Sequence, residues 1–85
     1  MSTEPTGTPQ ASPLGSMAVG FRGRVKELRL DPAERARLME MGLLAGTTVE
    51  VVRFAPLGDP VEIKVRGYHL TLRRHEADQV LVTPA

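Results

Sequence analysis

Two five-residue segments whose side chains alternate between apolar and polar, Val61–Val65 and Tyr68–Leu72, are separated by only Arg66 and Gly67. A two-residue connection with glycine predicts a β-hairpin, because glycine adopts the positive φ that such a tight turn requires. Pairing residues 61, 63 and 65 with residues 72, 70 and 68 is the only register that places all six apolar side chains on one face. This hairpin must bury that face against other elements, which favours a small antiparallel β structure.

A short helix is predicted between Asp31 and Gly42. Asp31 is a favourable N-cap, Pro32 suits the first helical position, and Glu34 lies three residues after the cap, as in a capping box. Gly42 takes the left-handed conformation that ends a helix, and the residue after it then packs on Leu38. A helix of about ten residues is not stable alone, so we expect it to dock on the sheet.

Three further segments are predicted strands, because they are rich in β-branched and other apolar residues. These are residues 24–30, 47–54 and 79–83, while residues 55–60 and 74–78 are predicted as a loop and a short turn. The apolar phase changes at Val51–Val52, which indicates a bulge or a bend. The element order predicts a mainly β fold: a small antiparallel β-barrel of about five strands, with one short α-helix inserted after the first strand and covering an open end.

Length and composition restrict the class of protein. The chain has 85 residues, no cysteine and a formal net charge of +1. One domain fits this length, and the absence of cysteine excludes a disulfide framework, a zinc ribbon and a cysteine nucleophile. Residues 1–13, rich in proline, serine and threonine, predict a disordered tail, with the folded domain over residues 14–85. No apolar run approaches the roughly 20 residues that span a bilayer and no secretory signal is recognisable, so we expect a cytoplasmic protein without membrane insertion.

Basic residues occur in two short groups, Arg22 with Arg24 and Arg73 with Arg74. A small barrel that binds RNA usually stacks bases on exposed aromatic side chains, whereas Phe54 and Tyr68 are predicted core residues. RNA binding is therefore a weaker alternative, and we expect no nucleic-acid partner.

No motif indicates catalysis or nucleotide binding, so the chain is predicted not to be an enzyme and no catalytic residue is assigned. His75, Glu76 and Asp78 carry side chains that can ligate a divalent cation. The competing interpretation is a solvated polar turn. We expect no cofactor other than a weakly bound Fe²⁺ or another divalent metal.

The strongest candidate for a functional surface is apolar. Met41, Leu43 and Leu44 surround the predicted helix end, and Pro56 and Leu57 lie in the loop. A domain this small has difficulty burying all five, so they are candidates for a protein-docking surface. The alternative is that these side chains close the mouth of the barrel.

Several motifs occur together in one order. They are R-L-M-E-M-G-L-L-A-G-T over residues 37–47, G-D-P-V over 58–61, G-Y-x-L-x-L-R over 67–73 and E-A at 76–77, preceded by the spacing of Leu14, Met17, Gly20, Gly23 and Val25. Any one of these pieces is weak, but the set is specific. Together they resemble the FeoA family, the small ferrous iron transport protein A.

This resemblance implies an SH3-like β-barrel with an inserted helix. It also implies a cytoplasmic accessory protein that docks on and modulates FeoB, the membrane protein with a GTPase domain that imports Fe²⁺. The same barrel occurs at the C-terminus of iron- and manganese-dependent repressors, so a free-standing metal-responsive regulatory barrel is the alternative. Pairing of exposed hairpin edges between copies would give a weak homo-oligomer.

Overall fold

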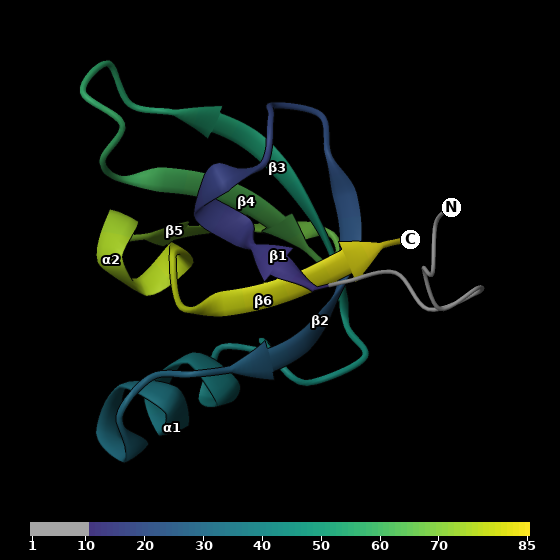
Figure 1. Cartoon of the computed structure of the whole chain (residues 1–85), viewed down its shortest axis with the longest axis vertical. Helices are drawn as coiled ribbons and strands as arrows, with labels where there is room; N and C mark the ends of the chain where they lie inside the picture. Colours follow the sequence, from purple (N-terminus) through teal and green to yellow (C-terminus); the bar gives the residue numbers. More distant parts are fainter. Residues whose placement is uncertain (1–10) are drawn as a thin grey trace, which may run out of the picture.

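The computed structural model describes residues 11–85, and the chain forms one strongly curved antiparallel sheet with helices at its ends (Figure 1). The strand order in the sheet is β1-β6-β2-β3-β4-β5. In chain order the elements are β1 (Ser12–Pro13), the 3₁₀ turn η1 (Leu14–Ser16), β2 (Arg22–Leu28), α1 (Pro32–Glu40), β3 (Thr48–Phe54), β4 (Val61–Val65), β5 (Tyr68–Leu72), α2 (Arg74–Ala77) and β6 (Val80–Pro84). The mainly β fold with one main helix after the first long strand is confirmed.

The first strand begins earlier than the sequence indicates. Ser12 and Pro13 pair with Val82 and Leu81 of β6, so the predicted tail over residues 1–13 extends two residues too far into the fold. The next residue, Leu14, is fully buried in the core. Residues 1–10 lie outside the described part, and the prediction of disorder for them stays a prediction.

The β4–β5 hairpin has the predicted register, with Val65 opposite Tyr68 and Val61 opposite Leu72. The phase change in β3 is also confirmed as an irregularity, because the pairing with β4 shifts between Val51 and Arg53. Tyr68 differs from the expectation, since 42% of it is exposed. It lies at the strand end beside the turn, and its hydroxyl donates a hydrogen bond to the carbonyl of Met41 instead of entering the core.

Helix α1 begins and ends where its capping residues predict. The Asp31 carboxylate accepts a hydrogen bond from the backbone N–H of Glu34 at 2.9 Å. Gly42 has a φ of 104°, and the N–H of Leu43 donates to the carbonyl of Leu38 at 3.0 Å, which is the Schellman arrangement. Leu38 is the one buried residue of this helix.

The predicted turn over residues 74–78 contains the short helix α2. Glu76 and Ala77 of this helix are buried, and the Glu76 carboxylate accepts the backbone N–H of Arg73 at 3.0 Å. Core side chains come from every long strand, from α1 and α2, and from the segment before β2. The fully buried ones include Leu14, Leu38, Leu43, Val49, Val51, Val61, Ile63, Val65, Leu72, Ala77 and Val80.

Candidate functional site

Exposed apolar side chains gather at the C-terminal end of α1. Met39 and Leu44 are 42% and 39% exposed, and Met41 is half-buried between them in the sequence. Tyr68 joins this group through its hydrogen bond to the Met41 carbonyl. We call Met39, Met41, Leu44 and Tyr68 the helix-end surface. The Schellman ending fixes the backbone on which three of these side chains stand, so the surface is held in place before any partner arrives.

Leu43 does not belong to this surface. It is fully buried, and its place directly after Gly42 turns it back onto Leu38 in the core. The prediction of Leu43 as a surface contact is therefore wrong, because the residue that follows the left-handed cap packs against the helix it ends.

Pro56 and Leu57 lie far from the helix end. Both are exposed in the β3–β4 loop, and Leu57 is 95% exposed. Figure 1 shows this loop and α1 at opposite ends of the long axis of the molecule. Met41 and Leu44 thus both lie at the C-terminal end of α1, whereas Pro56 and Leu57 form a separate exposed tip.

The predicted metal ligands are only partly brought together. His75 and Glu76 lie near Glu34 of α1, and one ligand atom from each of the three residues falls within 4.8 Å of the others. Asp78 instead pairs with Arg74 at 3.1 Å. Sequence reasoning missed Glu34, because it is 41 residues from His75 in the chain and was assigned to the capping box.

The Glu34 carboxylate lies 3.1 Å from Nε2 of His75, and it does not close the capping box on Asp31. Glu76 is already engaged, because one carboxylate oxygen pairs with Arg37 and the other accepts the Arg73 N–H. A cation at this site would have Glu34 and His75 as available ligands and would compete with the Arg37 guanidinium for Glu76. Glu34 and Arg37 thus connect α1 to α2.

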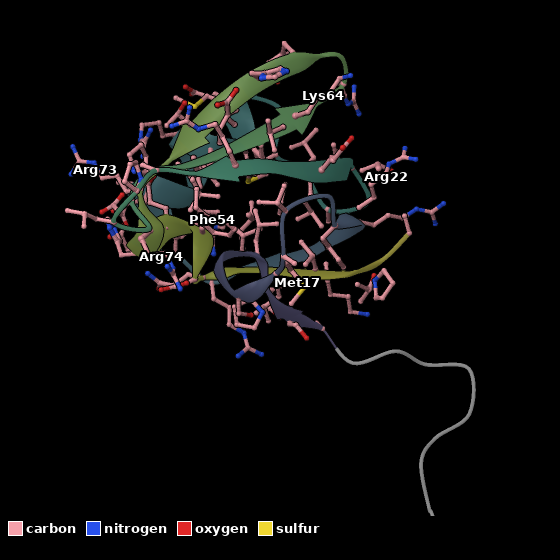
Figure 2. All side chains as sticks on the ribbon, turned by 90° about the horizontal axis from the view of Figure 1, so that it is seen from above. Met17, Arg22, Phe54, Lys64, Arg73 and Arg74 are labelled. Atoms are coloured by element: carbon pink, nitrogen blue, oxygen red, sulfur yellow. The ribbon has the colours of Figure 1, made fainter. Side chains whose placement is uncertain are left out.

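The two basic groups lie on different sides of the molecule. Figure 2 shows Arg73 and Arg74 away from Arg22 and Lys64. The Arg74 guanidinium lies 6.0 Å from the centre of the Phe54 ring, so this aromatic side chain is covered by a cation.

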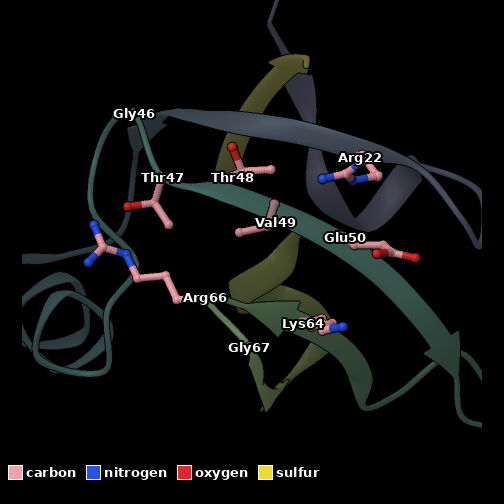
Figure 3. Close-up of a pocket in the computed structure, with 9 residues that line it drawn as sticks. All are labelled: Arg22, Gly46, Thr47, Thr48, Val49, Glu50, Lys64, Arg66 and Gly67. Carbon is pink, nitrogen blue, oxygen red and sulfur yellow. The ribbon is translucent and has the colours of Figure 1, made fainter.

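A hollow of about 440 Å³ lies over the outer face of β2, β3 and β4 (Figure 3). Its charged lining residues are Arg22 from β2, Glu50 from β3, Lys64 from β4 and Arg66 from the β4–β5 turn. These four charged residues are not recognisable as a group in the sequence, because they are spread over 45 residues, from 22 to 66. Only strand pairing brings them together.

Among residues 11–85, neither helix has the length and apolar character needed to cross a lipid bilayer.

The fold is similar to that of solved FeoA structures. FeoA from Stenotrophomonas maltophilia in complex with zinc, described as a prokaryotic SH3 domain protein, superposes with a TM-score of 0.67 at 27% identity over 86% of this chain and 88% of that chain. The solution structure of FeoA from Chlorobium tepidum superposes with a TM-score of 0.80 at 44% identity, covering 84% of this chain and 68% of that chain. The predicted SH3-like barrel is therefore confirmed.

A manganese-dependent transcriptional repressor also superposes, with a TM-score of 0.84 over 92% of this chain and 38% of that chain. At 18% identity this likeness shows a shared fold and nothing of function.

A curated relative places a similar sequence in a larger protein. It is the Fe(2+) transport protein A/Fe(2+) transporter FeoB fusion protein of Porphyromonas gingivalis, 44% identical over 48 residues. The match covers 56% of this chain and only 6% of that protein. The FeoA domain model itself matches residues 12–84, nearly all of the described structure. The chain belongs to the FeoA domain family.

Proposed function

We propose that this chain is a cytoplasmic accessory protein of ferrous iron uptake, which acts by docking on a FeoB-type transporter and modulating it. The observation that carries this proposal is the relative in which an FeoA sequence and the FeoB transporter form one polypeptide. Fusion keeps two partners at a high effective concentration, so it is favoured where the separate proteins work in contact. The role is binding, without a catalytic step of its own.

The helix-end surface is the contact that the geometry supports best. Met39, Leu44 and Tyr68 each leave about two fifths of their surface in solvent. Burying such side chains against a partner gains about 25 cal/mol per Å² of apolar area, and aromatic and methionine side chains are enriched in interface cores. Met41 gives the surface a flexible apolar side chain that adapts to a partner groove.

A binding measurement with one substitution at each end of the molecule tests the surface. The cytoplasmic part of FeoB from the same organism is immobilised, and binding of wild type, Leu44→Glu and Leu57→Glu is measured by interferometry. We expect Leu44→Glu to weaken binding at least about tenfold, because a carboxylate would be buried without a partner, and Leu57→Glu to bind like wild type.

If Leu57→Glu weakened binding and Leu44→Glu did not, the docking site would instead be the β3–β4 loop with Pro56 and Leu57. Absence of binding by wild type would refute docking altogether. Uptake of ⁵⁵Fe²⁺ in a strain lacking the gene, complemented with the same three forms, connects binding to transport.

A metal-responsive regulatory barrel is the second candidate, and the proximity of Glu34, His75 and Glu76 favours it. Calorimetry with Fe²⁺ under anaerobic conditions, and with Mn²⁺, decides between the two. Binding tighter than about 1 mM that is lost in His75→Ala would support this second role, and heat no greater than dilution would remove it.

A further inference from the structure

We propose that β5, an outer strand of the sheet, pairs antiparallel with β5 of a second copy of this chain, so that the two sheets join in a weak symmetric dimer. The edge of β5 is distinct from the Glu34–His75 contact, and it shares only Tyr68 with the helix-end surface. The proposal does not depend on FeoB being a partner.

The two edges of the sheet differ in their protection against strand pairing. The outer strands in the order of the sheet are β1 and β5. Strand β1 has only two residues, and one of them is Pro13, which has no backbone N–H. Strand β5 has five residues without lysine, proline or glycine, and its pairing with β4 has no bulge. Proteins usually protect a long edge by such devices, so an edge that lacks them indicates a partner strand.

The β4–β5 turn determines which backbone groups of β5 face outward. Both turn residues have positive φ, +51° and +90°, as a two-residue type I′ turn requires, so Val65 and Tyr68 exchange both of their backbone hydrogen bonds. The N–H and C=O groups of His69 and Thr71 therefore point away from β4. Within residues 11–85, no hydrogen bond ends on these four groups. Burying them unpaired would be costly, so they lie in water or meet a partner strand.

The sequence of β5 matches a copy of itself. In the antiparallel register centred on Leu70, His69 of each copy is opposite Thr71 of the other. Each such pair exchanges two backbone hydrogen bonds, so all the outward groups of both strands are satisfied. Tyr68 of each copy is then opposite Leu72 of the other. No other antiparallel register pairs all five residues of both strands, and this self-complementarity selects a second copy as the partner.

The side chains of β5 agree with this register. Tyr68 is 42% exposed and Leu70 is half-buried, although both lie on the same face of the strand as the buried Leu72. Pairing places Leu70 beside its own copy and Tyr68 beside Leu72, which extends the apolar face across the contact. On the other face His69 meets Thr71, so no like charges oppose each other. One strand pair buries less area than a stable complex needs, so we expect a dissociation constant between about 0.1 and about 1 mM.

A dilution series tests the dimer. Translational diffusion and amide shifts of the ¹⁵N-labelled full chain are recorded by NMR from about 2 mM down to about 20 µM. We expect slower diffusion at high concentration, with the largest shifts at the amides of His69 and Thr71. Thr71→Pro removes an outward N–H that β4 does not use, and it should weaken dimerisation at least about tenfold. Thr71→Val keeps that N–H and should dimerise like wild type.

Disulfide crosslinking tests the register, because the chain has no cysteine of its own. Leu70→Cys places the thiols of two copies at directly opposed positions whose Cα atoms are about 4.5 Å apart, within the range of a disulfide. Thr71→Cys places them on a diagonal, about 7 to 8 Å apart and beyond that range. We expect Leu70→Cys to crosslink at least about tenfold faster than Thr71→Cys in air.

Three results would overturn the proposal. Monomeric diffusion of wild type at about 2 mM would exclude the dimer, and the edge of β5 would then be open to a strand of a different protein. Dimerisation of Thr71→Pro as strong as that of wild type would place the contact elsewhere. Crosslinking of Thr71→Cys as fast as that of Leu70→Cys would refute the register, and this pair of variants decides alone if Thr71→Pro does not fold.

Discussion

Helix α1 is the longer of the two helices of this domain, but helix α2 buries more of its side chains. Helix α1 has nine residues and both end signals, yet Leu38 is its one buried side chain. Helix α2 has four residues, and the Asp59 and Glu76 carboxylates accept the N–H groups of Arg74 and Arg73 at its start, yet it buries both Glu76 and Ala77. Local sequence signals therefore decide that a helix forms, whereas its burial depends on where the barrel has room. The exposed, well-capped helix supplies a surface, and the short helix completes the core.

Two side-chain contacts connect the helices, Arg37 with Glu76 and Glu34 with His75. In addition to the burial of Leu38, the Glu34 contact holds the beginning of α1 against the rest of the molecule and the Arg37 contact holds its middle. The hydrogen bond from the Tyr68 hydroxyl to the Met41 carbonyl holds its end. Substitutions at these points separate what stabilises α1 from what stabilises the barrel.

The largest effect is expected for Leu38→Ala. Removing the one buried side chain of α1 leaves a cavity and should lower the free energy of unfolding by about 3 kcal/mol in urea denaturation. Met39→Ala, on the next residue of the same helix but largely exposed, should cost less than about 1 kcal/mol. Similar losses from the two variants would mean that α1 is not anchored by Leu38.

Glu76→Gln should have the next largest effect, about 2 kcal/mol. The Glu76 side chain is 4% exposed, and glutamine keeps its size but leaves the Arg37 guanidinium without its negative partner. Asp78→Asn alters an exposed pair with Arg74 and should cost no more than about 0.5 kcal/mol. Equal costs for the two variants, measured by denaturation at pH 7, would contradict the anchoring role given to α2.

Asp31→Ala removes the N-cap and should cost about 1 kcal/mol. Asp31→Asn keeps an oxygen that accepts the Glu34 N–H and should cost only a few tenths. The difference in unfolding free energy between the two variants, measured by thermal unfolding, gives the contribution of the capping hydrogen bond alone. A loss larger than that of Leu38→Ala would show that α1 depends on its cap more than on its docking.

The smallest effect on stability is expected for Leu44→Glu, within about 0.5 kcal/mol of wild type, because Leu44 is already partly in solvent. Its effect on partner binding should be large at the same time. Unfolding curves recorded beside the binding measurement separate the two, and a loss of several kcal/mol would assign Leu44 to the core.

The hairpin register and the two ends of α1 could be predicted from the sequence, because each depends on residues close together in the chain. Alternation over five residues fixes the partner of Val65, and Asp31 and Gly42 act on backbone groups within one turn. Membership of the FeoA family was likewise recognisable from the motif order, and the family model confirms it.

The candidate sites were harder to predict, since they depend on distant residues. Glu34 meets His75 across 41 positions, and Arg22, Glu50 and Lys64 share a row only because three strands are in register. Met41 and Pro56 look alike as apolar residues of predicted element ends, but the α1 end and the β3–β4 loop to which they belong lie at opposite ends of the molecule (Figure 1). The burial of Leu43, in contrast, was predictable from its place after Gly42, and it conflicts with the second expectation that Leu43 contacts a partner.

The sequence alone determined the family, the order of the five long strands and α1, and the local turns and caps, because these depend on side chains acting on their own backbone neighbourhood. The tertiary structure decided which apolar residues remain exposed, which charges find a partner and which three cations surround one hollow. The physical reason is that burial and ion pairing are set by the curvature and register of the whole sheet. Those quantities are properties of all the strands together, and no single segment contains them.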